Sequence, residues 1–264
     1  MPDLTRHPLL PVTIDGPLAT VTFDRPQVRN AFDRGMWEGL GATMAVLSQQ
    51  DALRCVILRG AGGEAFCAGA DIASFERELA TPEDEDRYAA ALSSGMQSIR
   101  LCRHPVIAQI QGFCLGGGAG IATMCDFRVG GASLRFGITA AKLNLWYAYA
   151  EIDPIVQICG TGVVSEMLIE ARIFTGREAY EKGLLSRLVA DDQVEAESLA
   201  LAGRISALAP MAARFHKQAI RRLRGPLPIT PEEELAVNGF IATHDFRGAV
   251  AAFKARQTPV FEGR

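Results

Sequence analysis

The first half of the chain alternates segments typical of strands with segments typical of helices. Residues 18–24 (LATVTFD) alternate apolar and polar positions and are rich in β-forming residues, which predicts a half-buried strand. Residues 33–50 carry apolar residues at helical spacing, and Asp33 stands where an N-cap is expected. Residues 53–60 (LRCVILRG) form an apolar run closed by a glycine, which predicts a strand buried on both faces.

The alternation continues through the middle of the chain. Residues 83–101 are mostly polar and compatible with a helix, and residues 105–112 (PVIAQIQG) predict a second buried strand. A glycine run then leads into a short apolar helix, and residues 127–136 hold one or two short strands. Strands that alternate with helices in this way indicate an α/β architecture with parallel strands.

After residue 160 the composition is mainly helical. Residues 174–176 (FTG) and 185–190 (LSRLVA) are extended interruptions, and three prolines in residues 225–231 (GPLPITP) predict a linker. The predicted helices cover residues 162–171, 177–183, 193–208, 211–224 and 231–254.

These patterns divide the chain into a core of residues 1–200 and a helical extension of residues 201–264. The extension has to dock either on its own core or on another subunit. We find no internal repeat and no low-complexity segment in the sequence.

Length and charge describe an ordinary globular protein. The 264 residues are 48% hydrophobic and 22% charged, which is enough for one large core. The net charge of −3 argues against nucleic acid as the main partner. The basic residues Arg214, Lys217, Arg221, Arg222 and Arg224 do cluster, which fits either a solvated helix face or a site for a phosphorylated ligand.

The six cysteines, at positions 55, 67, 102, 114, 125 and 159, lie mostly in apolar runs and form no CxxC pair. We therefore expect reduced, buried thiols and neither a zinc site nor a dithiol redox motif. The N-terminal residues lack the layout of a secretory signal, and no apolar run approaches the roughly 18 residues of a membrane span. The sequence thus predicts a cytoplasmic protein that is not bound to a membrane.

Two glycine-containing segments each follow a predicted buried strand. In residues 114–126 (CLGGGAGIATMCD), the glycines precede a helix, whose first N–H groups have no internal partner. Residue 121 is Ile, so the spacing does not fit the GxGxxG nucleotide fingerprint, and no GK[ST] is present. Residues 66–72 (FCAGADI) form the second segment. Two such segments could each offer one backbone N–H, the minimum for an oxyanion hole.

These segments and four others resemble, in order, the crotonase or enoyl-CoA hydratase/isomerase superfamily, over roughly residues 12–224. The resemblance implies an α/β fold with a crotonase-like (ββα) spiral core and a C-terminal helical extension. The motifs that carry it are RPQVRNAFD (25–33), FCAGADI (66–72), PVIAQIQGFCLGGGAGIATMCDFRV (105–129), FGITAAKLNL (136–145), FTGREAYEKGLLSRLV (174–189) and ARFHKQAI (213–220).

The resemblance also implies an acyl-CoA site. The oxyanion hole of the family falls on the backbone N–H groups of Ala70 and Gly117, which would hold the thioester oxygen as it becomes an enolate. Two tight turns kept small for packing are the alternative interpretation. The positions that the resemblance assigns to CoA binding are Val28, Arg29, Ala68, Asp71, Ile72 and Lys217.

The two glutamates with which hydratases of the family perform acid–base catalysis are absent, since this chain has Gly120 and Ala140 at those positions. Glu151 is the best substitute, if it faces the acyl pocket. Alternatively, it is a carboxylate in the first turn of a helix, where the helix dipole favours it. Ala148 stands where related dehalogenases have an aspartate, which argues against that reaction.

We therefore expect an enzyme of the enoyl-CoA hydratase/isomerase type, a lyase or isomerase whose exact reaction is open. A CoA-thioester decarboxylase or hydrolase is the alternative, and a non-catalytic acyl-CoA-binding protein is another. Coenzyme A would enter as part of the substrate, with no separate cofactor and no metal. The resemblance implies a homotrimer, or a hexamer built as a dimer of trimers.

Overall fold

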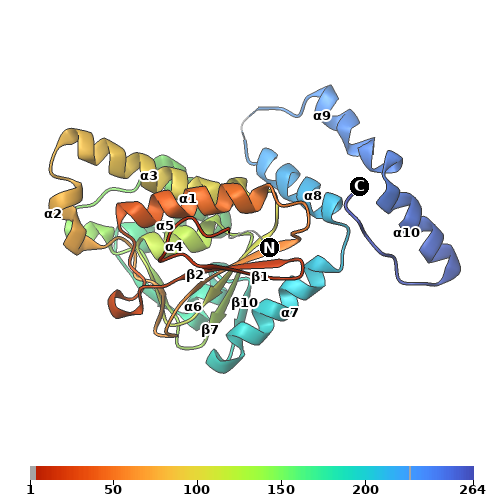
Figure 1. Ribbon diagram of the computed structural model, residues 1–264. Coiled ribbons are helices and arrows are strands. Elements are labelled where there is room, and N and C mark those ends of the chain that lie inside the picture. Colours follow the sequence, from red (N-terminus) through yellow and green to blue (C-terminus); the bar gives the residue numbers. More distant parts are fainter. Residues whose placement is uncertain (1–3, 226) are drawn as a thin grey trace.

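Two β-sheets form the centre of the computed structural model, which describes residues 4–225 and 227–264 (Figure 1). The larger sheet has six strands in the order β1-β2-β3-β5-β7-β10, and the smaller has four in the order β4-β6-β8-β9. The strands are β1 (Val12–Asp15), β2 (Leu18–Phe23), β3 (Cys55–Gly60), β4 (Ala65–Cys67), β5 (Val106–Ile110), β6 (Phe113–Leu115), β7 (Phe127–Gly131), β8 (Arg135–Gly137), β9 (Ile173–Thr175) and β10 (Arg187–Val189).

Helices cover both faces of the larger sheet and continue beyond it at the C-terminus (Figure 1). The α-helices are α1 (Arg34–Ser48), α2 (Phe75–Glu78), α3 (Pro82–Leu101), α4 (Gly117–Met124), α5 (Tyr149–Leu168), α6 (Gly176–Glu181), α7 (Val194–Ser206), α8 (Pro210–Arg222), α9 (Pro231–Ala236) and α10 (His244–Ala255). Short 3-10 helices are η1 (Pro26–Val28), η2 (Ile72–Ser74), η3 (Ala140–Leu143), η4 (Asp191–Gln193) and η5 (Val237–Ala242).

One unit recurs three times along the core. β3, β5 and β7 each pair in parallel in the larger sheet, and each is followed by a short strand of the smaller sheet and then by a helix. The α/β fold with a (ββα) core is thereby confirmed. The sequence shows no repeat because β4, β6 and β8 have only three residues each, too few for an alternating pattern to be visible.

The strand predicted at residues 53–60 is buried on both faces, as expected. Cys55 and Ile57 point to one side of the sheet and pack on α7, whereas Val56 and Leu58 belong to the main core on the other side. Alternation along a strand sends successive side chains to opposite faces, so an apolar run of this kind needs helices on both sides.

The helix predicted at residues 33–50 is α1, and its predicted cap is confirmed. The Asp33 carboxylate accepts a hydrogen bond from the Met36 N–H at 2.9 Å, which satisfies one of the unpaired donors at the helix start. α1 packs along α3, and the fully buried Trp37 contacts Phe32 with their rings 4.6 Å apart.

Two helical predictions differ from the structure. α5 begins at Tyr149 rather than near residue 162, and Gly160 breaks it with a φ of 77°, a conformation that favours glycine. The helix predicted over residues 231–254 is divided into α9, η5 and α10, because Thr243 is extended and caps α10 by accepting a hydrogen bond from Phe246 N–H.

Within the extension, α9 and α10 lie beyond α8, away from the two sheets (Figure 1). α7 spans the boundary drawn after residue 200 and packs on the larger sheet. In the linker predicted at residues 225–231, Pro226 lies outside the described residues. Among the described helices, none combines the length and the apolar character needed to cross a bilayer.

The last residues of the chain are bound to α10 and to the core. The buried Asp245 carboxylate accepts hydrogen bonds from the N–H groups of Glu262 and Gly263, each at 2.8 Å. Arg54, next to β3, donates to the Phe261 carbonyl oxygen at 3.4 Å. The chain end therefore connects α10 with the edge of the core.

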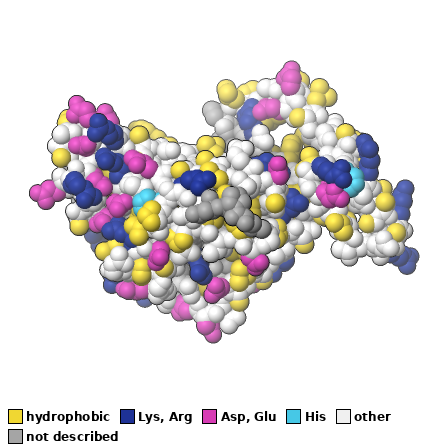
Figure 2. Space-filling view, viewed as in Figure 1, with side chains coloured by type: hydrophobic (Ala, Val, Ile, Leu, Met, Phe, Trp, Pro, Cys, Tyr) yellow, Lys and Arg dark blue, Asp and Glu magenta, His cyan; other side chains and the backbone are white. Residues whose placement is uncertain are grey.

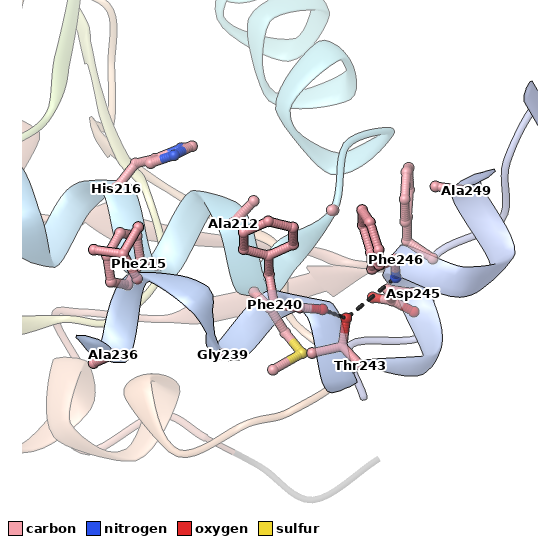
Figure 3. Close-up of a pocket in the computed structure, with 14 residues that line it drawn as sticks. Ala212, Phe215, His216, Ala236, Gly239, Phe240, Thr243, Asp245, Phe246 and Ala249 are labelled. Carbon is pink, nitrogen blue, oxygen red and sulfur yellow. Dashed lines mark hydrogen bonds between the residues drawn. The ribbon is translucent and has the colours of Figure 1, made fainter. Parts of the chain in front are cut away.

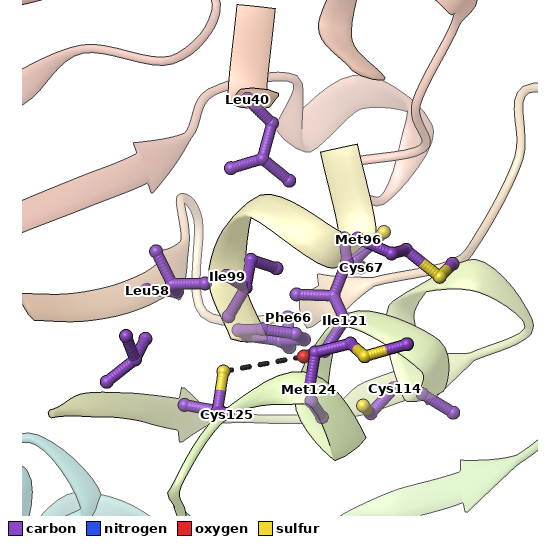
Figure 4. Packing of buried hydrophobic residues seen from close by; sticks show 14 of the residues in the cluster. Leu40, Leu58, Phe66, Cys67, Met96, Ile99, Cys114, Ile121, Met124 and Cys125 are labelled. Carbon is purple, nitrogen blue, oxygen red and sulfur yellow. Dashed lines mark hydrogen bonds between the residues drawn. The ribbon is translucent and has the colours of Figure 1, made fainter. Parts of the chain in front are cut away.

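The glycines of α4 allow it to approach its neighbours closely. A β-carbon at Gly118 would overlap the backbone carbonyl of Cys67 in β4, which cannot move aside without disrupting the sheet. A β-carbon at Gly120 would instead lie 2.7 Å from the terminal methyl group of Met96, the flexible end of a side chain on α3. Figure 4 shows Met96 and Cys67 beside Ile121 of α4 in the main core.

This difference predicts unequal effects of the same substitution. We expect Gly118→Ala to lower the free energy of unfolding by at least about 2 kcal/mol, because backbone overlap forces the helix away from β4. For Gly120→Ala we expect a change below about 1 kcal/mol, since the gain in helix propensity offsets the small shift of Met96. Urea unfolding followed by circular dichroism measures both, and equal losses would contradict the packing described here.

Candidate active site

A cavity of about 520 Å³ opens between α3 and the segment that leads into α5. Apolar side chains form most of its wall, among them Leu92, Met96 and Leu145. Backbone from residues 68–70 and 116–117 also lines it. Both glycine-containing segments of the sequence therefore face one cavity.

The N–H group of Ala70 is directed away from its neighbouring segment. Phe32 N–H donates to the Gly69 carbonyl and Asp71 N–H donates to the Phe32 carbonyl, each at 2.8 Å. In this parallel bridge the residues on either side of Ala70 make the bonds, so the N–H of Ala70 points the other way. Within residues 4–225 and 227–264 it has no hydrogen-bond acceptor.

The N–H group of Gly117 is the first of α4. A first-turn N–H has no partner inside its own helix, and no acceptor for that of Gly117 is present in the described part of the chain. It lies at the positive end of the helix dipole, where negative charge is stabilised.

The loops that carry these two N–H groups touch each other. Gly69 has a φ of 103°, and a β-carbon there would come within 3.0 Å of both the Gly117 nitrogen and the Leu115 carbonyl oxygen. A β-carbon at Gly117 would lie 3.1 Å from the Trp37 ring. Glycines at these two positions therefore allow the backbones to approach closely beside an indole.

Glu151 faces the same cavity. It lies in the first turn of α5, lines the cavity, and is only 8% exposed. Burial raises the pKa of its carboxyl group, and a hydrogen bond from the backbone of Ala148 opposes part of that shift. Both interpretations offered from the sequence thus describe one residue, a first-turn carboxylate that is also part of the cavity wall.

Two tyrosines, Tyr88 and Tyr147, also line the cavity. The Tyr88 hydroxyl accepts a hydrogen bond from Trp37 Nε1 at 3.4 Å, and burial raises its pKa to about 12. Burial, followed by the charge of Glu151, also raises the pKa of Tyr147. Sequence reasoning did not assign Trp37 or Tyr88 to the site, because apolar spacing on α1 and α3 is the same for a cavity wall as for a core.

The positions of the two missing glutamates are occupied differently. Gly120 is buried, and the tip of Met96 lies where its side chain would begin. Ala140 lines the cavity with its small side chain. Among the described residues, the carboxylates that line the cavity are the exposed Glu85 and the buried Glu151.

The residues predicted to bind CoA are only partly brought together. Ala68 and Ile72 line the cavity, and Ile72 is 48% exposed. Ala68 N–H donates to the Arg29 carbonyl at 2.9 Å, which places Arg29 and the exposed Val28 beside this edge. The Arg29 side chain pairs with Glu64 at 2.7 Å.

Asp71 and Lys217 are each held by a charged partner within the chain. The Asp71 carboxylate pairs with Arg25 at 3.0 Å and makes no capping bond to η2. Lys217 is 6% exposed, and its ammonium group contacts Asp126 at 2.6 Å and donates to the His104 carbonyl at 2.8 Å. The solvated helix face does not hold at Lys217, which is buried and lies outside the cavity, and its expected contact with CoA stays a prediction.

A second cavity, of about 680 Å³, lies between α8 and the C-terminal helices (Figure 3). Phe215, Phe240 and Phe246 form much of its wall, and the Thr243 hydroxyl bonds to backbone groups of α10 and η5. Its carboxylate, Asp245, binds the chain end, so polar groups available to a substrate are few. The cavity at Ala70 and Gly117 is the better candidate for catalysis.

Comparisons with known proteins agree with this fold. Residues 13–264 match the family model described as enoyl-CoA hydratase/isomerase. Enoyl-CoA hydratase EchA19 of Mycobacterium tuberculosis is 31% identical over 220 residues, with 80% of each chain covered. An enoyl-CoA hydratase/carnithine racemase structure from Magnetospirillum magneticum superposes with a TM-score of 0.95 at 38% identity, covering 98% of this chain and 97% of that one. An enoyl-CoA hydratase structure from Bacillus anthracis gives 0.89 at 27% identity, covering 97% and 100%.

The burial of Glu151 predicts a pH-dependent stability. Because the pKa of the folded-state carboxyl group is raised, its ionisation favours unfolding, and the loss of stability develops as the pH rises through that value. Glu151→Gln should therefore raise the melting temperature at pH 8, and the gain should shrink as the pH falls to about 4, near the pKa of an unfolded glutamate.

Asp153→Asn removes an exposed carboxylate from the same helix and is the control, which should change the melting temperature at pH 8 less than Glu151→Gln does. Differential scanning calorimetry at both pH values makes the comparison. A gain for Glu151→Gln that is equal at both pH values would show that the carboxyl group is not desolvated.

Proposed function

Because the chain belongs to the enoyl-CoA hydratase/isomerase family, we propose that it binds a CoA thioester and stabilises its enolate between the N–H groups of Ala70 and Gly117. The observation that carries the proposal is that neither group has an acceptor among the described residues and that both segments line one cavity. Two fixed donors in a cavity of low polarity stabilise a developing oxyanion strongly, because no reorganisation is needed when the charge forms.

The wall of the cavity supports an apolar acyl group. Leu92, Met96 and Leu145 offer aliphatic surface, and Trp37 places an indole beside Gly117. The exposed edge at Val28, Arg29 and Ile72 is open to the remainder of the CoA molecule. Coenzyme A is part of the substrate in this proposal, and no other cofactor is required.

Glu151 is the proposed acid–base group, and the reaction it fits best is migration of a double bond. Its carboxylate would take a proton from the α-carbon of a 3-enoyl thioester, which places negative charge on the thioester oxygen. The resulting carboxylic acid would return the proton at the γ-carbon and give the 2-enoyl thioester. One buried carboxylate suffices for this transfer, and its raised pKa makes it a stronger base.

Hydration is less favoured because it requires one group to activate water and another to protonate carbon. Gly120 and Ala140 supply neither. Decarboxylation of a malonyl-type thioester is the second candidate, since loss of CO₂ yields the same enolate without a base. The absence of carboxylates at positions 120 and 140 is the observation that favours it.

We also propose that the chain assembles as a homotrimer, alone or paired into a hexamer. Apolar side chains on the extension are unusually exposed in the single chain: Leu235 is 72% and Ile241 54% exposed. Figure 2 shows apolar side chains among charged ones over this part of the surface. Another subunit would remove them from water.

Turnover of a small panel of thioesters tests the proposed reaction. We expect wild-type protein to isomerise a 3-enoyl-CoA and Glu151→Gln to lower kcat by roughly 100-fold or more, because the proton carrier is lost. Asp153→Asn is the matched control and should retain activity.

The other outcomes separate the alternatives. Release of CO₂ from malonyl-CoA that survives Glu151→Gln would favour the decarboxylase, and hydrolysis to free CoA would indicate a hydrolase. Binding of every thioester without turnover would contradict an enzymatic role and support an acyl-CoA-binding protein.

Sedimentation equilibrium tests the assembly. Wild-type protein should sediment at three or six times the chain mass of 28.4 kDa. Leu235→Gln should weaken the assembly, because it removes exposed apolar surface, whereas Glu234→Gln on the same helix should not. A stable wild-type monomer would refute the proposal.

A further inference from the structure

Each of the two loops that line the cavity is preceded by a buried cysteine. Cys67 ends β4 three residues before Ala70, and Cys114 lies in β6 three residues before Gly117. The two cysteines are partners in the parallel pairing of β4 with β6, and both are fully buried. They therefore offer a matched pair of side chains in almost the same surroundings.

Only one of the two bonds to its loop. The Gly69 N–H donates to Cys67 Sγ at 3.3 Å, and the same sulfur lies 3.8 Å from the Gly69 carbonyl oxygen, to which its S–H can donate. Cys114 makes no side-chain hydrogen bond within the described part of the chain. Burial raises the pKa of Cys67 to about 12, so near neutral pH the group is a thiol that can both donate and accept.

The direction of the Ala70 N–H follows from the geometry of one peptide unit. The Gly69 carbonyl and the Ala70 N–H belong to the same planar trans peptide and point in opposite directions. Phe32 N–H holds the carbonyl on one side at 2.8 Å, and the Ala70 N–H must then face the cavity. Any rotation of that peptide would turn the N–H away.

Gly69 is the residue most able to rotate. Its φ of 103° lies in a region that glycine enters without steric cost, and because glycine has no side chain, the residue itself does not restrain the peptide. The restraint has to come from partners of its N–H and carbonyl groups, and Cys67 Sγ contacts both.

We propose that Cys67 is a positioning residue, whose sulfur holds the Gly69 backbone so that the Ala70 N–H is aimed at the thioester oxygen. The inference rests on the proposed function of Ala70 and Gly117. It assigns to Cys67 no contact with substrate and no covalent chemistry. A cysteine that merely fills space is the competing explanation, and Cys114 provides the comparison.

Three variants separate the two explanations. Cys67→Ala removes the acceptor and should lower kcat by about 10-fold, a fraction of the 100-fold or more that loss of an oxyanion donor costs, with KM little changed. Cys67→Ser should restore kcat to within about threefold, because its hydroxyl can accept the Gly69 N–H. Cys114→Ala deletes the same sulfur atom from the neighbouring strand and should leave kcat within about threefold, since it breaks no hydrogen bond to the loop.

Amide hydrogen exchange of the substrate-free protein gives a second measurement that does not depend on turnover. The Gly69 amide should exchange at least about 10-fold faster in Cys67→Ala than in Cys114→Ala, because only the first loses its acceptor. If wild-type protein turned over no thioester, the proposed function would fail while the exchange rates still reported on Cys67.

Equal kcat and equal Gly69 exchange in Cys67→Ala and Cys114→Ala would overturn the inference. Should Cys67→Ala fail to fold, Cys67→Val takes its place, because valine fills the space but offers no acceptor. It should show the same fall in kcat and the same faster exchange of the Gly69 amide. Failure of Cys67→Ser to restore both quantities would also count against it, provided that the variant remains folded.

Discussion

Close contact between two backbone loops is the constraint on which the rest of the site depends. Gly69 lies against Gly117 and Leu115, and Gly118 lies against the carbonyl of Cys67. A side chain at Gly69 or Gly118 would push the loops apart, and the N–H groups of Ala70 and Gly117 would no longer share one cavity. The small sheet β4-β6-β8-β9 holds the strands from which both loops emerge. The larger sheet and its helices support that arrangement from behind.

Local signals in the sequence were enough to predict part of the fold and part of the site. Asp33 is a cap because its side chain reaches the third residue of α1. The apolar run at 53–60 is buried on both faces because successive apolar side chains point to opposite sides of the sheet. The glycines around residues 69 and 117 were informative as well. Glycine loses much conformational freedom when a chain folds, so several glycines together indicate that the backbone there approaches another group closely.

Predictions failed where the deciding partner lies far away in the chain. Lys217 is buried because its ammonium group pairs with Asp126 and donates a hydrogen bond to the His104 carbonyl. Nothing within α8 indicates those partners. Met96 likewise contacts Gly120 from another helix, so the sequence reveals a missing glutamate but not what fills the space. Glu151 could be placed on a helix from its neighbours, but its direction depends on how α5 docks against α3 and α4.

The placement of the thiols has a practical consequence for measuring the stability of this chain. Five of the six cysteines are buried, and only Cys159 is partly accessible. A thiol reagent added to native protein should therefore modify one site at once and the other five only when the core opens. The slow phase of labelling reports how often the interior is exposed to solvent, so the natural sequence carries its own probes of conformational opening without any introduced dye or mutation.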